Sequence, residues 1–469
     1  MKVEQIYTGC LAQGAYYIES EGEAAIIDPL RETGPYLQKA ADNKVQIKYI
    51  FETHFHADFV SGHLDLARKT GAQIIYGPNA NTAYDKYTAK DGELFPLGKL
   101  TIKVLHTPGH TPESTTYLLL DEAMQPYAIF TGDTLFIGDV GRPDLAQKNG
   151  ELSKEDLAGW LYDSLRNKIM TLPDQVIVYP AHGAGSACGK SMSKETWDTL
   201  GNQKKTNYAL RADMTKAEFI REVTAGLLPP PPYFSENARL NKVGYESIDQ
   251  VMERGAKALS PKEFERLANE TSALIMDVRP KEDFVKGFIP NSIFIGLDGS
   301  FAPWVGALVR DLQQAILIVA PKGREEETVK RLARVGYDNA IGYLEGGFES
   351  WQQAGHEIDV LKTIDVATFI QRHQADPSIA VLDVRKPNEW EAEHIEGSQN
   401  FPLDFINRKM GEISREQHYY THCRSGYRAI VAASILKARG FEQLTSIQGL
   451  FSDIAASSIP TSAFVCPST

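Results

Sequence analysis

A sequence repeat in the second half of the chain constrains its fold most strongly. Ile275-Met276-Asp277-Val278-Arg279 returns as Val381-Leu382-Asp383-Val384-Arg385, and the copies of this and other segments lie 103 to 106 residues apart. This spacing is much longer than a solenoid repeat, so each copy can form a domain with its own core. Within each copy, short apolar runs alternate with helical patterns such as 326–334 and 429–439. The alternation predicts a mostly parallel sheet covered on both faces.

The first 180 residues predict a separate α/β layered domain. Helical patterns near 61–70 and 153–167 lie between short β-branched and aromatic runs. The predicted strands are 24–27, 48–51, 73–76, 100–105, 115–120, 128–130 and 176–179. The run Leu228-Pro229-Pro230-Pro231-Pro232 marks an arm or boundary, because proline lacks the backbone donor that helices and central strands need. We therefore expect three domains, at residues 1–245, 246–358 and 359–469.

Composition excludes some classes of partner. The formal net charge is −12, and this acidic balance argues against a nucleic-acid partner. The chain starts without an apolar signal core, and no run approaches the roughly 18 apolar residues of a membrane helix. Four scattered cysteines are too few for a disulfide framework. We expect a cytoplasmic protein with reduced thiols and no membrane partner.

Side chains that bind metals follow several of the predicted strands. Because the ends of neighbouring strands meet at one edge of a sheet, these side chains can converge, although a single histidine would carry little meaning. The residues in question are His54, His56, Asp58, His110, Asp133 and His182.

This set of motifs, His54-x-His56-x-Asp58 followed by the later histidines and Asp133, resembles the metallo-β-lactamase superfamily over residues 1 to 240. The resemblance implies an αββα sandwich. In dinuclear members, one metal site corresponds to His54, His56 and His110, and the second needs Asp58, the histidine that follows it and His182, with the Asp133 equivalent bridging. Here Phe59 replaces that following histidine. A dinuclear hydrolase of glyoxalase II type is therefore disfavoured.

A single metal held by two histidines and one carboxylate suits non-haem Fe(II) and oxygen chemistry. In the superfamily this arrangement resembles the persulfide dioxygenases, whose ligands match His54, His110 and Asp133. The resemblance implies one Fe(II) per N-terminal domain, although zinc also fits these ligands. His56, Asp58 and His182 would then orient ligands or waters.

Two further segments agree with this branch. Gly141-Arg142-Pro143-Asp144 resembles the Gly-Arg-x-Asp element of persulfide dioxygenases, and Arg142 either lies near substrate or braces the loop through Asp144. The segment around Cys188 resembles members that are fused to rhodanese domains. Cys188 either has a chemical role near the site entrance or is a small residue in a glycine-rich turn.

The third domain contains a cysteine loop, His422-Cys423-Arg424-Ser425-Gly426-Tyr427-Arg428, between a predicted strand and a predicted helix. Backbone N–H groups and the helix N-terminus favour an anionic sulfur there, and both arginines add positive charge. The loop resembles that of rhodanese sulfurtransferases, and is one residue shorter than the loop of protein phosphatases. The resemblance implies that residues 424–428 cradle a persulfide on Cys423. The family's C-terminal Gly-Gly-x-x-x-Trp segment is eroded here to Gly449–Asp453.

The middle copy lacks this nucleophile. Ala320 stands at the position of Cys423, and Glu325 replaces the closing arginine, which reverses the charge that a sulfur anion requires. We interpret it as a catalytically silent rhodanese-like domain with a scaffolding role.

Together the motifs predict a persulfide dioxygenase fused to rhodanese. It would oxidise a low-molecular-weight thiol persulfide, of glutathione, coenzyme A or a similar thiol, with O2 to sulfite, and Cys423 would form or use thiosulfate. The alternatives are a glyoxalase II-type thioester hydrolase with rhodanese, and a sulfur carrier or sensor with a vestigial metal site. A homo-oligomer is compatible with the sequence, which does not fix the direction of sulfur flow.

Overall fold

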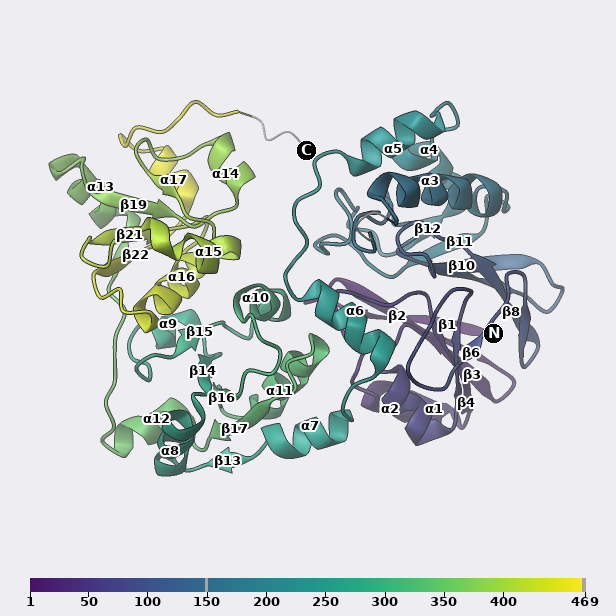
Figure 1. Ribbon diagram of the computed structural model, residues 1–469, viewed down its shortest axis with the longest axis horizontal. Helices are drawn as coiled ribbons and strands as arrows, with labels where there is room; N and C mark the ends of the chain where they lie inside the picture. Colours follow the sequence, from purple (N-terminus) through teal and green to yellow (C-terminus); the bar gives the residue numbers. More distant parts are fainter. Residues whose placement is uncertain (148–150, 466–469) are drawn as a thin grey trace. The chain divides into compact units, whose positions relative to one another are not determined.

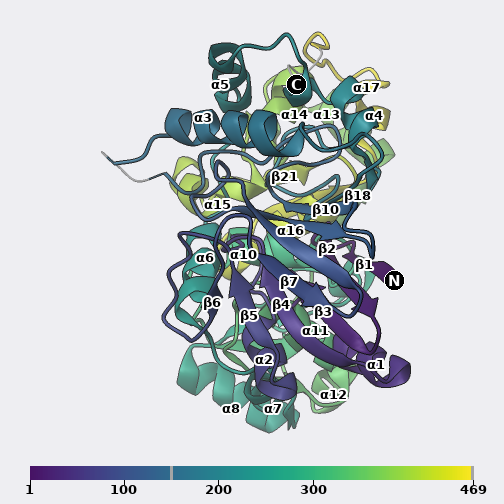
Figure 2. The same ribbon diagram turned by 90° about the vertical axis from the view of Figure 1, so that its right-hand side faces the viewer.

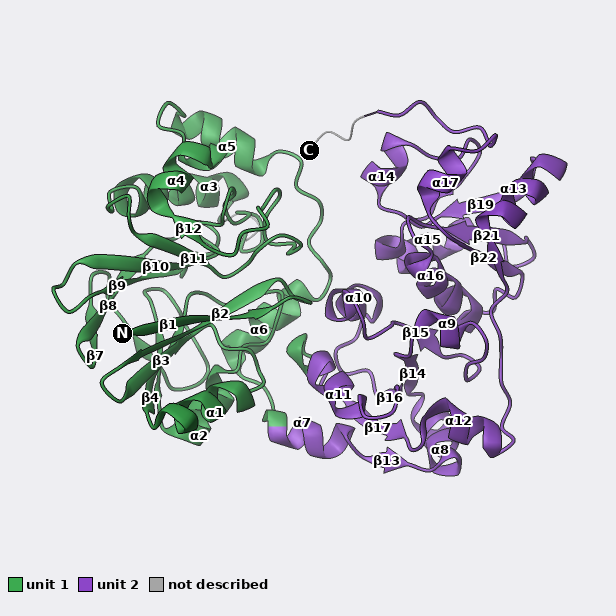
Figure 3. Cartoon of the chain, turned by 180° about the vertical axis from the view of Figure 1, so that it is seen from behind, with its two compact units in different colours: residues 1–248, 333–336 green, residues 249–332, 337–469 purple. Residues whose placement is uncertain are grey.

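The computed structural model describes residues 1–147 and 151–465, which form two compact units (Figure 3). Unit 1 comprises residues 1–248 together with 333–336, and unit 2 comprises 249–332 and the chain from 337 onward.

Unit 1 contains two six-stranded sheets (Figures 1 and 2). The first has the order β1-β2-β3-β4-β5-β6, with β3, β4, β5 and β6 parallel to one another. Its strands are β1 (Lys2–Thr8), β2 (Gln13–Ser20), β3 (Glu23–Ile27), β4 (Gln46–Glu52), β5 (Gln73–Tyr76) and β6 (Tyr87–Thr88). The second has the order β12-β11-β10-β9-β8-β7. Its strands are β7 (Leu94–Leu97), β8 (Leu100–His106), β9 (Thr115–Leu120), β10 (Pro126–Gly132), β11 (Ile177–Pro180) and β12 (Asp198–Thr199).

Three apolar cores hold these layers together. The core between the sheets contains side chains from both, such as Phe51 and Phe130. A second core packs the outer face of the first sheet against α1 (Gly34–Asn43) and α2 (His63–Thr70), and a third packs the second sheet against α3 (Lys154–Ser164) and α5 (Lys216–Thr224). Alternating side-chain directions along each strand supply both faces at once. The unit is therefore the expected αββα sandwich.

Local sequence signals explain several helix boundaries. Ser153 and Thr215 each cap a helix, with Asp156 and Glu218 completing reciprocal capping boxes. The proline run has no regular structure and precedes α6 (Phe234–Val243). The predicted strands and helices of this unit are confirmed to within a few residues. The remaining short helices are η1 (Leu165–Ile169), α4 (Leu200–Thr206) and η2 (Tyr208–Leu210). The elements that were not predicted include β1, β2, β6, β7, β12, α1, α4, α5 and α6.

Unit 2 contains two five-stranded parallel sheets with the same strand order, β13-β17-β16-β14-β15 and β18-β22-β21-β19-β20. The repeat in the sequence is therefore a repeat of fold. The strands of the first sheet are β13 (Ala258–Leu259), β14 (Leu274–Asp277), β15 (Ile293–Phe294), β16 (Ile316–Val319) and β17 (Ala340–Leu344). Those of the second are β18 (Thr363–Asp365), β19 (Ala380–Asp383), β20 (Gln399–Asn400), β21 (Tyr419–His422) and β22 (Leu444–Gln448).

Helices surround both sheets. Those of the middle copy are α7 (Ile248–Gly255), α8 (Pro261–Thr271), α9 (Lys281–Phe284), α10 (Phe301–Leu308), α11 (Glu325–Arg334) and α12 (Gly347–Gln353). Those of the last copy are α13 (Val366–Ala375), α14 (Pro387–Ala392), η3 (Leu403–Phe405), α15 (Ile406–Lys409), η4 (Met410–Glu412), α16 (Tyr427–Ala438) and α17 (Phe451–Ala455).

No helix in the described ranges has the length and apolar character needed to cross a membrane. Cys10, Cys188 and Cys423 are free thiols, and Cys466 lies outside the described residues.

Candidate functional site

The metal-binding side chains predicted in unit 1 converge from four strand ends. His54 follows β4, His110 follows β8, Asp133 follows β10 and His182 follows β11. Nε2 of His110 lies 3.4 Å from Oδ2 of Asp133, and Nε2 of His54 lies 3.9 Å from the same oxygen. The ligand atoms of these three buried residues all lie within 4.8 Å of one another.

Hydrogen bonds orient both histidines toward Asp133. Oγ1 of Thr53 donates to Asp28 (2.8 Å), so it accepts from Nδ1 of His54 (3.0 Å). Nδ1 of His110 donates to the backbone carbonyl of Arg142 (2.8 Å). With their Nδ1 atoms protonated, both rings present Nε2 lone pairs to the cluster. Burial and the neighbouring histidines hold the pKa of His54 well below its usual range, which favours the neutral, metal-binding form.

The donor set fits a divalent metal. Neither carboxylate oxygen of Asp133 has a hydrogen-bond partner among the described residues, although the side chain is buried. An isolated buried carboxylate is costly unless it is paired or binds a metal. Two imidazole nitrogens and one carboxylate are ligands that suit iron or zinc.

A second group of side chains lies beside this triad. Nε2 of His182 lies 3.5 Å from Asp58 and 3.6 Å from Asp133, and neither ring nitrogen of His182 has a hydrogen-bond partner in the described part of the chain. Burial raises the pKa of Asp58. Together with His56, Asp58 and His182 form a second set of three groups at metal-binding separation.

His56 also pairs with two carboxylates outside this second set. Its Nε2 lies 3.0 Å from Asp28 and 3.7 Å from Glu52. Burial acts to lower the pKa of His56, but the Asp28 and Glu52 carboxylates outweigh it and raise the pKa to about 9. The buried ring of Phe59 packs against His56, with ring centroids 4.3 Å apart. In this second set, His56 is therefore paired with the Asp28 and Glu52 carboxylates, and the ring of Phe59 lies against it.

Arg142 braces the loop after β10. Its guanidinium forms two hydrogen bonds of 2.7 Å to Asp144 and further bonds to the backbone carbonyls of Ala187 and Leu228. These contacts are those of the expected alternative in which Arg142 braces the loop through Asp144. The Arg142 carbonyl also accepts the hydrogen bond from His110.

Cys188 is buried and lies with Asp133 and His182 in a further group at metal-binding separation. Burial and the charges of Asp58 and Asp133 raise the pKa of the Cys188 thiol well above its usual range.

Two positioning residues of this site were not predicted. Asp28, at the end of β3, accepts hydrogen bonds from both the backbone and the side chain of Thr53. Asn241 of α6 donates to the carbonyls of His56 and Phe59 (2.8 Å each) and accepts from Ser61 N (2.9 Å). Asn241 thus fixes the metal-binding loop from about 180 residues along the chain. The Ile-Asp-Pro segment at a strand end was a signal for Asp28, whereas nothing in the sequence around Asn241 marked it.

The cysteine loop of unit 2 lies between β21 and α16. Cys423 is 3% exposed, and its Sγ accepts a hydrogen bond from the backbone N–H of Gly426 (3.2 Å). Gly426 has φ of 90°, a conformation that favours glycine, and an added Cβ would meet Gln448 at 2.6 Å. Arg424 and Ser425 are exposed. The loop therefore places one backbone donor, the Gly426 N–H, against the sulfur.

Arg428 has a partner that the sequence did not indicate. Its guanidinium forms a two-point ion pair with Glu389, at 2.6 and 2.8 Å. Below the loop, Phe451 stacks on His422 and lies under Arg385, whose guanidinium carbon is 3.7 Å from the ring centroid. The eroded segment Gly449–Asp453 thus keeps the aromatic ring that supports the loop.

The middle copy repeats this support without the nucleophile. Arg279 lies over Phe348 at 4.1 Å, as Arg385 lies over Phe451. Ala320 follows β16 where Cys423 follows β21, and Glu325 begins α11. The supporting contact is maintained, while Ala320 and Glu325 replace the cysteine and the arginine at these two positions.

Comparisons with known proteins identify the families of both units. The metallo-beta-lactamase superfamily matches residues 8–182, and the rhodanese-like domain family matches 260–354 and 366–457. A solved metallo-beta-lactamase from Staphylococcus aureus is 31% identical with a TM-score of 0.64, and the match covers 98% of that chain and 73% of this one. The chain belongs to the metallo-beta-lactamase superfamily and carries two rhodanese-like domains.

Among curated superfamily relatives, two with different activities are about equally similar. The human persulfide dioxygenase ETHE1 is 34% identical over 162 residues, and a probable hydroxyacylglutathione hydrolase of Schizosaccharomyces pombe is 33% identical over 161 residues. Each match covers 34% of this chain. The matches cover 59% of the dioxygenase and 58% of the hydrolase, so the chain spans less than two thirds of the length of either relative. The superfamily implies a divalent metal, and with the rhodanese domains it indicates an enzyme.

Proposed function

We propose that unit 1 is a persulfide dioxygenase that binds one Fe(II) through His54, His110 and Asp133. The observation that carries the proposal is the contrast between this triad and the second set, in which His56 is paired with the Asp28 and Glu52 carboxylates. Two Nε2 atoms and a carboxylate lie within 4.8 Å of one another, while Phe59 fills the position beside Asp58 where a dinuclear site needs a ligand.

The proposed reaction converts a thiol persulfide, O2 and water into the free thiol, sulfite and two protons. The S–S bond breaks, and the outer sulfur is oxidised while O2 is reduced. Bound iron would supply the activation of O2 that side chains alone do not provide. Thr53 and the Arg142 carbonyl hold the two histidines in one tautomer, and the buried surroundings exclude bulk water.

We further propose that Cys423 carries sulfane sulfur. Thiosulfate would give its outer sulfur to the Cys423 thiolate and leave as sulfite, or the Cys423 persulfide would give its outer sulfur to sulfite in the reverse step. The Gly426 N–H contributes a donor to the anionic sulfur. Reduced thiols at Cys10, Cys188 and Cys423 suit the proposed cytoplasmic setting.

The rival function is a thioester hydrolase of glyoxalase II type. Asp58, His182 and Asp133 favour it, because they could hold a second metal despite Phe59. The hydrolase relative is also as similar as the dioxygenase relative.

Anaerobic purification, metal analysis and oxygen uptake with glutathione persulfide separate the two functions. We expect one iron per chain and oxygen uptake that depends on the persulfide. Two zinc ions, no oxygen uptake and cleavage of a glutathione thioester would contradict the proposal. Cys423→Ser should abolish thiosulfate formation from sulfite and leave oxygen uptake intact.

A further inference from the structure

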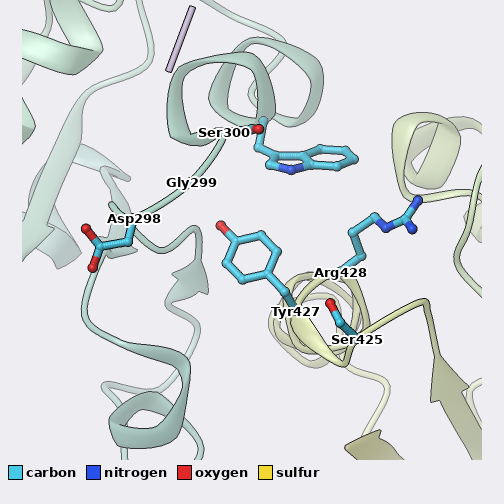
Figure 4. A pocket seen from close by; sticks show the side chains of 7 residues that line it. Asp298, Gly299, Ser300, Ser425, Tyr427 and Arg428 are labelled. Atoms are coloured by element: carbon cyan, nitrogen blue, oxygen red, sulfur yellow. The ribbon is translucent and has the colours of Figure 1, made fainter. Parts of the chain in front are cut away.

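A pocket of about 250 Å³ lies beside the cysteine loop, and both rhodanese-like copies line it (Figure 4). Ser425, Tyr427 and Arg428 belong to the active copy, and Figure 4 shows Asp298 and Ser300 opposite them, on the segment that leads into α10. The middle copy also contributes Trp304 of α10, which is partly exposed. The silent domain therefore forms one wall of a pocket at the sulfur-binding loop.

Direct contacts hold this wall against the loop. The hydroxyl of Tyr427 donates to the carbonyl of Gly296 (3.3 Å), and the Tyr427 ring packs edge-on against Phe294, with centroids 5.6 Å apart. Ser434 of α16 accepts a hydrogen bond from the backbone N–H of Phe294 (2.9 Å). The helix that follows Cys423 is thus bound to β15 of the silent copy.

Size and charge indicate what the pocket can accept. Its volume equals that of about eight water molecules, which exceeds the needs of a small sulfur oxyanion. Arg428 is paired with Glu389, and Asp298 is paired with Arg324 (2.9 Å). Paired charges attract a dianion such as sulfite weakly, because each cation is offset by a nearby carboxylate.

The remaining lining suits an organic molecule. The Trp304 indole offers an apolar face, and Ser300, Ser425 and Asp298 offer hydrogen-bonding oxygens. Pockets that combine one aromatic face with a few polar groups are typical of small organic ligands.

We infer that the silent domain selects an organic thiol as sulfur acceptor of Cys423, with Trp304 contacting the body of the thiol. In this step the thiol sulfur attacks the outer sulfur of the Cys423 persulfide, the S–S bond to Cys423 breaks, and Cys423 leaves as thiolate while the organic persulfide forms. The inference rests on the proposed sulfurtransferase activity. It gives the silent domain a role in specificity beyond scaffolding.

The test uses the full-length protein with thiosulfate as sulfur donor and two acceptors of different size, glutathione and cyanide. Trp304→Ala should raise the KM for glutathione about tenfold and leave kcat/KM for cyanide within about twofold. Trp304→Phe should retain most of the glutathione affinity. Trp197→Ala, which removes an exposed tryptophan of unit 1, serves as the control and should match the wild type.

The two acceptors distinguish the possible failures. Equal losses with glutathione and cyanide in Trp304→Ala would mean that the indole only supports the loop, and an unchanged KM for glutathione would mean that it does not contact the acceptor. Either result would overturn the inference while the sulfurtransferase activity stands. A wild-type protein that transfers sulfur neither to glutathione nor to cyanide would overturn both.

Discussion

Nε2 of His110 lies 3.4 Å from Oδ2 of Asp133, and its other ring nitrogen is held by the Arg142 carbonyl. This histidine is therefore held through Nδ1 and presents its Nε2 lone pair to the carboxylate, as a metal ligand would.

Replacing His110 tests whether the metal site is functional or vestigial. We expect His110→Ala to lose bound iron and persulfide-dependent oxygen uptake, because the triad loses one of its three ligands. His106→Gln is the matched control, since the His106 ring contacts the Pro112 carbonyl instead of the cluster. Persulfide consumption that persists unchanged in His110→Ala would favour a sulfur carrier or sensor.

Replacing Phe59 tests whether its side chain prevents a second metal ion from binding. Phe59→His should allow a second zinc ion to bind beside Asp58 and His182, so the metal content should rise from about one to about two per chain. Phe59→Leu removes the same aromatic contact with His56 without adding a ligand, and should stay at one. Metal analysis after zinc reconstitution gives the answer, and one zinc in all three proteins would show that Phe59 does not limit the second site.

Asn241 should control metal affinity from outside the ligand set. Asn241→Ala removes three hydrogen bonds to the loop that carries His54 and Asp58, and we expect metal affinity to fall about 10- to 100-fold. Asn237→Ala, on the same helix, is the control, because the buried Asn237 amide has no hydrogen-bond partner within the described ranges. Competition with a chelator measures both variants, and equal affinities would contradict the positioning role.

The two aspartates of the rhodanese repeat should differ in pH dependence. Burial acts to raise the pKa of Asp383, but His422 and Arg385 outweigh it and hold the pKa below its usual value. Its stabilising effect is therefore present above about pH 3.9 and is lost as the pH falls through the lower folded-state pKa. Burial raises the pKa of Asp277 despite the neighbouring Arg279. The contribution of Asp277 to folding stability therefore depends on pH in the opposite direction, and is lost as the pH rises through the raised folded-state pKa.

Thermal unfolding of Asp383→Asn and Asp277→Asn between pH 3 and pH 7 compares these effects. The loss of stability should grow with pH for Asp383→Asn and shrink with pH for Asp277→Asn. His422, which lies 3.5 Å from Asp383, is the difference between the copies, because Val319 stands in its place in the silent domain. Parallel pH profiles would contradict this explanation.

Residues at strand ends were predictable from the sequence. His54, His110, Asp133 and His182 each follow an apolar run, and the sheet edges bring such positions together whatever the detailed packing. The cysteine loop was predictable for the same reason, because Cys423 lies between an evident strand and an evident helix.

Partners that lie far apart in sequence were not predictable. Asn241 reaches Phe59 only because α6 packs onto the metal-binding loop, and Glu389 reaches Arg428 only through the fold of the last domain. Trp304 belongs to a copy without a nucleophile, so its own sequence carried no functional signal. Long-range packing decides these contacts, and no local pattern encodes it.

Oxygen consumption by the Fe(II)-loaded protein tests the central claim most directly. With limiting glutathione persulfide, we expect one O2 to be consumed and one sulfite to be formed for each persulfide, as the balanced reaction requires. The absence of oxygen uptake by protein with a full complement of iron, together with thioester cleavage by the zinc form, would contradict the account.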